Sequence, residues 1–252
     1  MRGFLHWSGP GGRVSKPETH NRLLQDLASS DPTAFKRLLR DLERTPLEAG
    51  ALLTPARRRT AWVYFVDSGI ISLVAGTRHG QSLEVAIVGR EGVAGFADAM
   101  GGLGLPYRLI VQLPGLAYRV RTGVIEKHIY SCTAMHDLLM TYSQVLMHQL
   151  SQSALCSRFH SSVQRLARWL LLTAERAGTV RLPLTHDVIA QMVGAPRSAV
   201  TQAAAELRSA GIIAYQRGLI TVRSIPRLHK RACECFDAVA VPMRAVSRAR
   251  AR

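Results

Sequence analysis

Four side chains in the second half of the sequence are of the types that bind soft metal ions. Cys156 and His160 are four residues apart, a spacing that places them on one face of a helix. Cys233 and Cys235 form a Cys-x-Cys pair further along the chain. Three thiolates and an imidazole suit Zn²⁺, provided that the two segments meet in space. The alternative is that they are small buried thiols with a packing role.

A second group of side chains has the types and spacing that read DNA. Polar and basic residues face outward on the first two turns of a predicted helix, the part that meets base edges in the major groove. Arginine can donate two hydrogen bonds to guanine there, a contact worth about 1–3 kcal/mol of discrimination. The predicted base-reading residues are Arg197, Ser198, Thr201 and Gln202, and the predicted phosphate contacts are Thr185, His186 and Arg217.

The elements that must position this second group form a winged helix-turn-helix. Thr185 can cap its first helix, and Gly194 permits a sharp turn because glycine adopts positive φ without strain. Pro196 sits at the start of the next helix, where its missing N–H costs nothing. A hairpin wing is predicted from two β-rich segments, Ile212–Tyr215 and Leu219–Val222.

Charge is concentrated beside this motif. The 252 residues carry 33 Lys and Arg against 17 Asp and Glu, a net charge of +16. Residues 132–252 hold 16 basic and 6 acidic side chains, whereas residues 1–131 hold 17 and 11. A basic half points to a polyanion as partner, although 29 of the basic residues are Arg, which genome bias also favours.

The first half changes from helix to strand. Residues 21–44 have helical apolar spacing that Asp31–Pro32 divides into two short helices. Short apolar runs then alternate with Gly, Pro and polar clusters, which predicts a β-sandwich or barrel. These runs are Trp62–Val66, Ile70–Val74, Leu83–Val88, Leu109–Leu113 and Leu116–Val120.

A long helix is predicted at Thr133–His160, about 42 Å at 1.5 Å per residue. Its apolar seam favours a parallel helix from a second chain, with an intramolecular bundle helix as the alternative. The predicted dimer residues on this seam are Leu139, Tyr142, Leu146 and Gln149. Ser162–Ala177 predicts a further helix, ended by Gly178.

The sequence lacks the motifs of an enzyme, an exported protein, a membrane-spanning protein or a disulfide-rich protein. The sequence shows no paired carboxylates, nucleophile elbow or phosphate loop, so we expect no enzyme. Met1–Asn21 contains a Gly-Pro-Gly-Gly run where an export signal needs an apolar segment, and no apolar run is long enough to span a membrane. Four cysteines make no disulfide framework. We therefore expect a cytoplasmic protein with no membrane partner.

This layout resembles the CRP/FNR family of bacterial transcription regulators. The most specific segments are LTHDVIAQMVGAPRSAV at 184–200 and LRSAGII at 207–213, supported by VYFVDSG at 63–69 and VGREGVAG at 88–95. The resemblance implies an α+β fold with a double-stranded, jelly-roll-like β-roll, and a homodimer on palindromic double-stranded DNA that contacts RNA polymerase. Arg197 matches the guanine-reading position, whereas Ser198 stands where the family often has Glu.

The resemblance also bears on the effector. Nucleotide-binding members carry a Gly-Glu pair that takes the ribose hydroxyl, but here Phe96 follows Gly95. Arg108 is the one candidate anion ligand left, so cAMP is not expected. Members with an iron–sulfur cluster use N-terminal cysteines, and this chain has none before Cys132. We expect five segments: a disordered tail (1–20), a sensor β-roll (21–131), a dimerisation helix (132–160), the DNA-binding domain (161–225) and a basic C-terminal extension (226–252).

Overall fold

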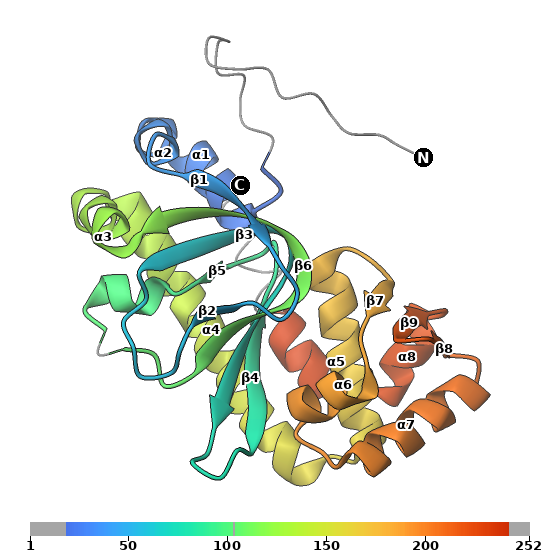
Figure 1. The fold of residues 1–252 in the computed structure, drawn as a ribbon. Coiled ribbons are helices and arrows are strands. Elements are labelled where there is room, and N and C mark those ends of the chain that lie inside the picture. Colours follow the sequence, from blue (N-terminus) through green and yellow to red (C-terminus); the bar gives the residue numbers. More distant parts are fainter. Residues whose placement is uncertain (1–18, 103, 242–252) are drawn as a thin grey trace.

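A computed structural model describes residues 19–102 and 104–241 and contains the three predicted parts, a β-roll, a long helix and a winged helix-turn-helix (Figure 1). This arrangement confirms the predicted α+β class. Residues 1–18 of the expected tail (1–20) and residues 242–252 of the expected C-terminal extension (226–252) lie outside the described residues. Within the described residues, no helix has the length and hydropathy needed to cross a bilayer.

Asp31 separates the first two helices, α1 (Arg22–Ser30) and α2 (Pro32–Leu39), as predicted. Its carboxylate accepts hydrogen bonds from the backbone N–H groups of Thr33 and Ala34 at the start of α2. Pro32 occupies the first helical position, where no N–H is needed.

Asn21 fastens α1 to the sheet. Its Oδ1 caps α1 by accepting from the Leu24 N–H, and its Nδ2 donates to the carbonyls of Val66 and Gly92, both at 2.8 Å. The residue is fully buried, so its side chain satisfies three backbone groups that water cannot reach.

One antiparallel sheet forms the β-roll, with the strand order β1-β6-β3-β4; β2 pairs with β6, and β5 with β3. The strands are β1 (Glu43–Leu47), β2 (Leu52–Thr54), β3 (Trp62–Gly76), β4 (Ser82–Val88), β5 (Val93–Ala94) and β6 (Arg108–Arg121). A 3₁₀ helix, η1 (Phe96–Met100), follows β5.

Strands β3 and β6 are each continuous, whereas the apolar runs predicted two separate strands for each. The pairing register shifts between Val66 and Ile71, where Gly69 has φ +84°. A Cβ on Gly115, the facing residue of β6, would lie 2.2 Å from the Ser68 carbonyl oxygen. Bulges therefore bend the strands at the positions where polar and glycine residues suggested that they end.

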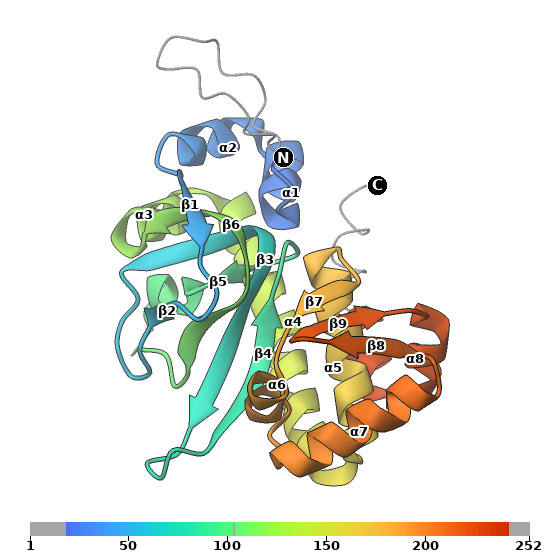
Figure 2. The ribbon, with the colours of Figure 1, turned by 45° about the vertical axis from the view of Figure 1, so that its right-hand side comes forward.

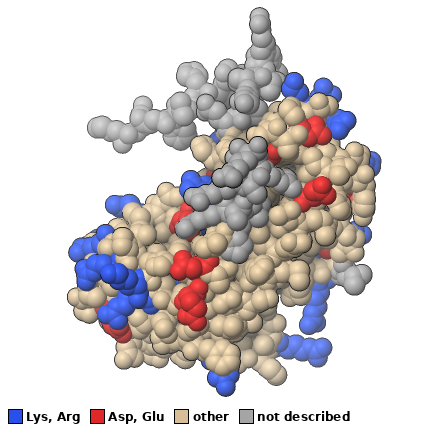
Figure 3. All heavy atoms as spheres, turned by 180° about the vertical axis from the view of Figure 1, so that it is seen from behind, with Lys and Arg blue, Asp and Glu red and all other residues tan. Residues whose placement is uncertain are grey.

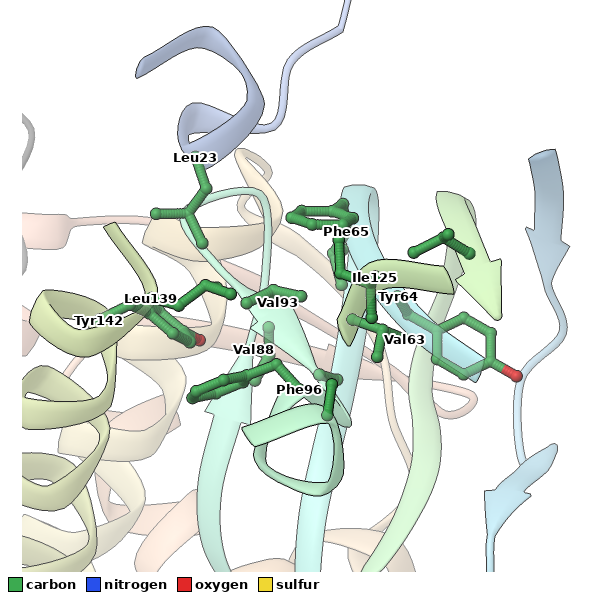
Figure 4. Packing of buried hydrophobic residues seen from close by; sticks show 14 of the residues in the cluster. Leu23, Val63, Tyr64, Phe65, Val88, Val93, Phe96, Ile125, Leu139 and Tyr142 are labelled. Atoms are coloured by element: carbon green, nitrogen blue, oxygen red, sulfur yellow. The ribbon is translucent and has the colours of Figure 1, made fainter. Parts of the chain in front are cut away.

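The long helix α4 (Thr133–Phe159) follows α3 (Thr122–Ser131) and has the predicted extent. Its predicted dimer face, however, lies inside the protomer. Leu139 and Tyr142 point into the β-roll (Figure 4), Leu146 is 8% exposed, and Gln149 accepts a hydrogen bond from Arg176. These four residues are not available to a second chain, because apolar spacing reveals a buried face but not what covers it.

The C-terminal half lies beside the sheet (Figure 2). Helix α5 (Ser162–Ala177) has its predicted bounds, with a capping box between Ser161 and Gln164 and a left-handed Gly178. The remaining elements are β7 (Arg181–Pro183), α6 (His186–Val193), α7 (Arg197–Ser209), β8 (Ile213–Gln216), β9 (Leu219–Val222) and α8 (Ile225–Arg231). Residues 235–241 are also helical.

The two halves share buried contacts. Ile70, Val74, Ile87 and Leu113 of the β-roll belong to the same apolar cluster as α5 and the winged helix-turn-helix. Arg176 of α5 is 5% exposed, donates to the Ile87 carbonyl and pairs with the buried Glu91 at 3.3 Å. A buried cation and a common core thus join the DNA-binding half to the sheet.

Candidate nucleic-acid interface

Helix α7 presents the predicted base-reading residues to solvent. Its inner face is buried against α5 and α6 and consists of Val200, Ala203, Ala204 and Leu207. All four predicted base-reading residues, Arg197, Ser198, Thr201 and Gln202, are exposed on the other side of its first two turns. The structure therefore places these four together, in the orientation that a major-groove helix requires.

Arg197 is held by an ion pair with Asp187. The Arg197 Nε and Asp187 Oδ1 atoms are 3.1 Å apart, and both side chains are more than 60% exposed. Asp187 lies in the first turn of α6, where a negative charge is favourable. A guanidinium that bonds to a guanine edge in this position must leave or share this carboxylate.

His186 contacts two groups of its own domain, and the phosphate contact predicted for it stays a prediction. Its ring stacks on Tyr215 of the wing, with centroids 4.3 Å apart, and its Nδ1 lies 3.1 Å from the Thr201 hydroxyl. Burial, followed by the charge of Arg197, lowers the pKa of His186, so the ring is neutral near pH 7. Its Nε2 is buried without a hydrogen-bond partner among the described residues. No functional role was predicted for Tyr215 from the sequence. The only sequence feature that could have indicated one is that an aromatic residue stands in the wing.

The wing carries Arg217 at its tip. Arg217 and Gly218 both have positive φ, +48° and +77°, as a tight two-residue hairpin requires. Arg217 is exposed. A Cβ placed on Gly218 would lie 3.8 Å from the Thr185 Cγ2 atom, so the tip of the wing is close to the start of α6. Thr185 caps α6 by accepting from the Val188 N–H, which leaves its hydroxyl hydrogen free to reach a phosphate.

Basic side chains gather on the flank of the winged helix-turn-helix, the left-hand side of the rear view in Figure 3. Helix α8 carries His229, Lys230 and Arg231 in its last turn, and Arg231 pairs with Glu206 of α7 at 2.9 Å. This concentration of charge agrees with the excess of basic residues in the second half of the sequence.

The end of α6 is fixed by a residue that the sequence did not single out. Arg165 of α5 donates through Nη2 to the carbonyls of Val193 and Gly194, which completes the last turn of α6. Gly194 has φ +63°, and a Cβ there would come within 2.5 Å of Leu83 in β4. The turn before α7 is therefore held by both α5 and the β-roll.

Phe96 occupies the interior of the β-roll. Its side chain is 4% exposed and packs edge-on against Tyr142 of α4, with ring centroids 5.6 Å apart (Figure 4). Arg108, the candidate effector ligand, stands partly buried at the start of β6 and opposite Val74.

The predicted metal-binding residues come together. One ligand atom from each of Cys156, His160, Cys233 and Cys235 lies within 4.8 Å of the others. The hydrogen bond between the Cys233 and Cys156 sulfurs lowers the pKa of Cys156 to about 5 and raises that of Cys233. The end of α4 and the Cys-x-Cys pair therefore meet in space, which the spacing of these residues in the sequence could not establish.

A β-roll joined through a long helix to a winged helix-turn-helix defines a class of DNA-binding transcription regulators. Residues 164–231 match the family described as the Crp-like helix-turn-helix domain. The global nitrogen regulator of Synechococcus elongatus is 25% identical over 179 residues, which cover 67% of this chain and 78% of that protein.

Solved structures share the fold over about three quarters of this chain. FixK2 from Bradyrhizobium japonicum superposes with a TM-score of 0.66 at 17% identity, covering 76% of this chain and 98% of that one. A CRP-family transcriptional regulator from Thermus thermophilus gives 0.60 at 16% identity, covering 75% and 96%. The matched domain and the curated relative support a transcription regulator of the CRP/FNR type, and the solved structures show that this chain has the same fold.

Proposed function

We propose that this regulator is a homodimer that reads a two-fold symmetric DNA site through α7. The observation that carries this proposal is the exposed polar face on the first two turns of α7, next to a basic flank. Two copies of α7 related by a two-fold axis would enter successive major grooves about 34 Å apart.

Each side chain has a role that follows from its place. Arg197 reads a guanine, and Ser198 and Gln202 contact neighbouring base edges. Thr185 and Arg217 bind phosphates on either side of the groove. His186 holds the Thr201 hydroxyl and the wing in register through the contacts described above.

Selection of bound DNA from a random pool tests the reading role. We expect an inverted repeat, and Arg197→Ala should remove the preference at one base pair in each half-site, at a cost of about 1–3 kcal/mol. Arg217→Ala should weaken binding to all sequences and lower the salt slope by about 1. Arg37→Ala, an exposed arginine on α2, is the control. Unchanged selectivity in Arg197→Ala would contradict the assignment of α7.

The dimer contact is proposed on the face of α4 that stays exposed. Exposed positions recur in steps of four and three, the heptad pattern of a coiled coil. These positions are Thr133, Asp137, Met140, Gln144, Met147, Ser151, Ala154 and Arg158. Met147 is 65% exposed and Met140 41%, apolar surface that a second α4 would cover.

Light scattering after gel filtration tests this contact. Met147→Glu places like charges on the proposed seam and should convert a dimer to a monomer. Leu52→Glu, at a side chain that is 54% exposed on β2, is the matched control and should leave the mass unchanged. A Met147→Glu protein that remains dimeric would refute this interface.

The β-roll is proposed not to respond to cAMP. Phe96 supports this, because an apolar ring in the roll cannot satisfy a ribose hydroxyl. Calorimetric titration with cAMP should give no binding heat, and binding at micromolar concentration would overturn the proposal.

At promoters, we propose that the cytoplasmic dimer contacts RNA polymerase.

A further inference from the structure

Three cysteines form a buried cluster of their own, apart from the two apolar cores. Cys156, Cys233 and Cys235 are at most 4% exposed. Cys156 lies in the last turn of α4, and His160 is the residue at which that helix ends. The other two cysteines follow α8, beyond the wing, so the cluster joins segments more than 70 positions apart.

The distances match a tetrahedral site. Zn²⁺ with Zn–S bonds of about 2.3 Å and a Zn–N bond of about 2.0 Å needs ligand atoms about 3.5–3.8 Å apart. The Cys156 and Cys233 sulfurs are 3.5 Å apart, and the Cys235 sulfur is 3.5 Å from His160 Nδ1. All four ligand atoms lie within 4.8 Å of one another, so small side-chain movements complete the tetrahedron.

Outer contacts orient the ligands. The Nε2 of His160 lies 3.2 Å from a carboxylate oxygen of Glu234, an acceptor that places the ring proton on Nε2 and leaves Nδ1 free to bind. The Nε2 of Gln152 donates to the Cys235 sulfur at 3.0 Å. A carboxylate–histidine pair of this kind is the usual second contact of a metal-bound histidine.

Charge supplies an independent argument. Arg165 and Arg168 of α5 line a small cavity together with Cys156. Two nitrogens of Arg168, Nε and Nη1, are buried and have no hydrogen-bond partner among the described residues. Three thiolates, a neutral imidazole and Zn²⁺ carry one negative charge in total, which this guanidinium complements.

We propose that Cys156, His160, Cys233 and Cys235 bind one Zn²⁺ ion per chain. The ion would fasten the segment after the wing to the junction between α4 and α5. It would therefore hold the DNA-binding half against the end of the central helix.

The test is the metal content of the full-length protein by mass spectrometry after gel filtration. We expect one zinc per chain in the wild type and less than a tenth of that in Cys235→Ser. Cys132→Ser is the matched control, because Cys132 is also buried but lies at the opposite end of α4. Zinc in substoichiometric amounts in the wild type, equal zinc in both variants, or iron in its place would overturn the proposal.

Two further measurements remain decisive if Cys235→Ser does not fold. Glu234 is 76% exposed, so Glu234→Gln should fold normally and weaken zinc binding about tenfold in competition with a chromogenic chelator. Co²⁺ added to the metal-free wild type should produce the visible bands of a tetrahedral thiolate site. An unchanged affinity in Glu234→Gln together with a colourless Co²⁺ protein would refute the site.

Discussion

Glu84 should make the stability of the protein depend on pH in the direction opposite to that of most carboxylates. This residue of β4 is buried between the sheet and α5, where its two oxygens accept from the Ser72 hydroxyl at 2.5 Å and the Trp169 Nε1 at 2.6 Å. Burial raises its pKa from 4.5 to about 7, against the lowering effect of these hydrogen bonds and of two nearby arginines.

The sign and size follow from linkage. The folded protein binds the Glu84 proton more tightly than the unfolded chain does, so this contribution is fully present below pH 4.5 and is lost as pH rises to about 7. Each unit by which the pKa rises corresponds to about 1.4 kcal/mol, so the whole rise corresponds to about 3 kcal/mol of unfolding free energy.

Urea unfolding at several values between pH 4.5 and 8 measures this effect in wild type and in Glu84→Gln. Glutamine keeps the shape of the protonated acid and does not titrate, so the stability of the variant relative to wild type should rise by about 3 kcal/mol across this range. Glu48→Gln, at an exposed carboxylate, is the control and should show no such trend. A difference between Glu84→Gln and wild type that does not vary with pH would refute the reasoning.

Three more substitutions test particular contacts. Asn21→Ala removes a helix cap and one hydrogen bond to each of two carbonyls, those of Val66 and Gly92. Urea unfolding should therefore show a loss of about 2–4 kcal/mol, and a loss under about 1 kcal/mol would contradict the contacts. Arg176→Met leaves Glu91 buried without its cation and should cost about 3–5 kcal/mol by the same assay, with an unchanged midpoint as the contrary result. Asp187→Ala frees Arg197 from its ion pair and removes a negative charge that would face DNA. Titration of the selected DNA site should therefore show about 2- to 5-fold tighter binding. Weaker binding would mean that Asp187 itself contacts the bases.

Local signals predicted the helices well. Gly178 marked the C-terminal end of α5, and the structure adds a capping box of Ser161 and Gln164 at its N-terminal end. The turn into α7 likewise follows from Gly194. Such signals act through nearby backbone groups, so spacing in the sequence is enough to find them.

Contacts between distant segments could not be predicted. The bulges in β3 and β6 depend on how two strands pair, so Gly69 and Gly115 suggested chain breaks instead of bends. The spacing of Leu139 and Tyr142 showed that one face of α4 is covered, but the β-roll covers it, not a second chain. His186 has a role that depends on Tyr215 and Thr201, which only the folded wing brings to it.

The common core of the two halves limits how this regulator can switch. Lifting α5 away from the sheet would expose Ile70, Val74, Ile87 and Leu113 to water. Exposing an aliphatic side chain costs about 1.5–3 kcal/mol, so the state in which α5 is lifted from the sheet would lie about 6–12 kcal/mol above the closed one. Its population would then be below about one molecule in ten thousand. An effector would need a comparable difference in affinity to populate it. A change that separates the two halves is therefore far costlier than one that keeps these four side chains covered.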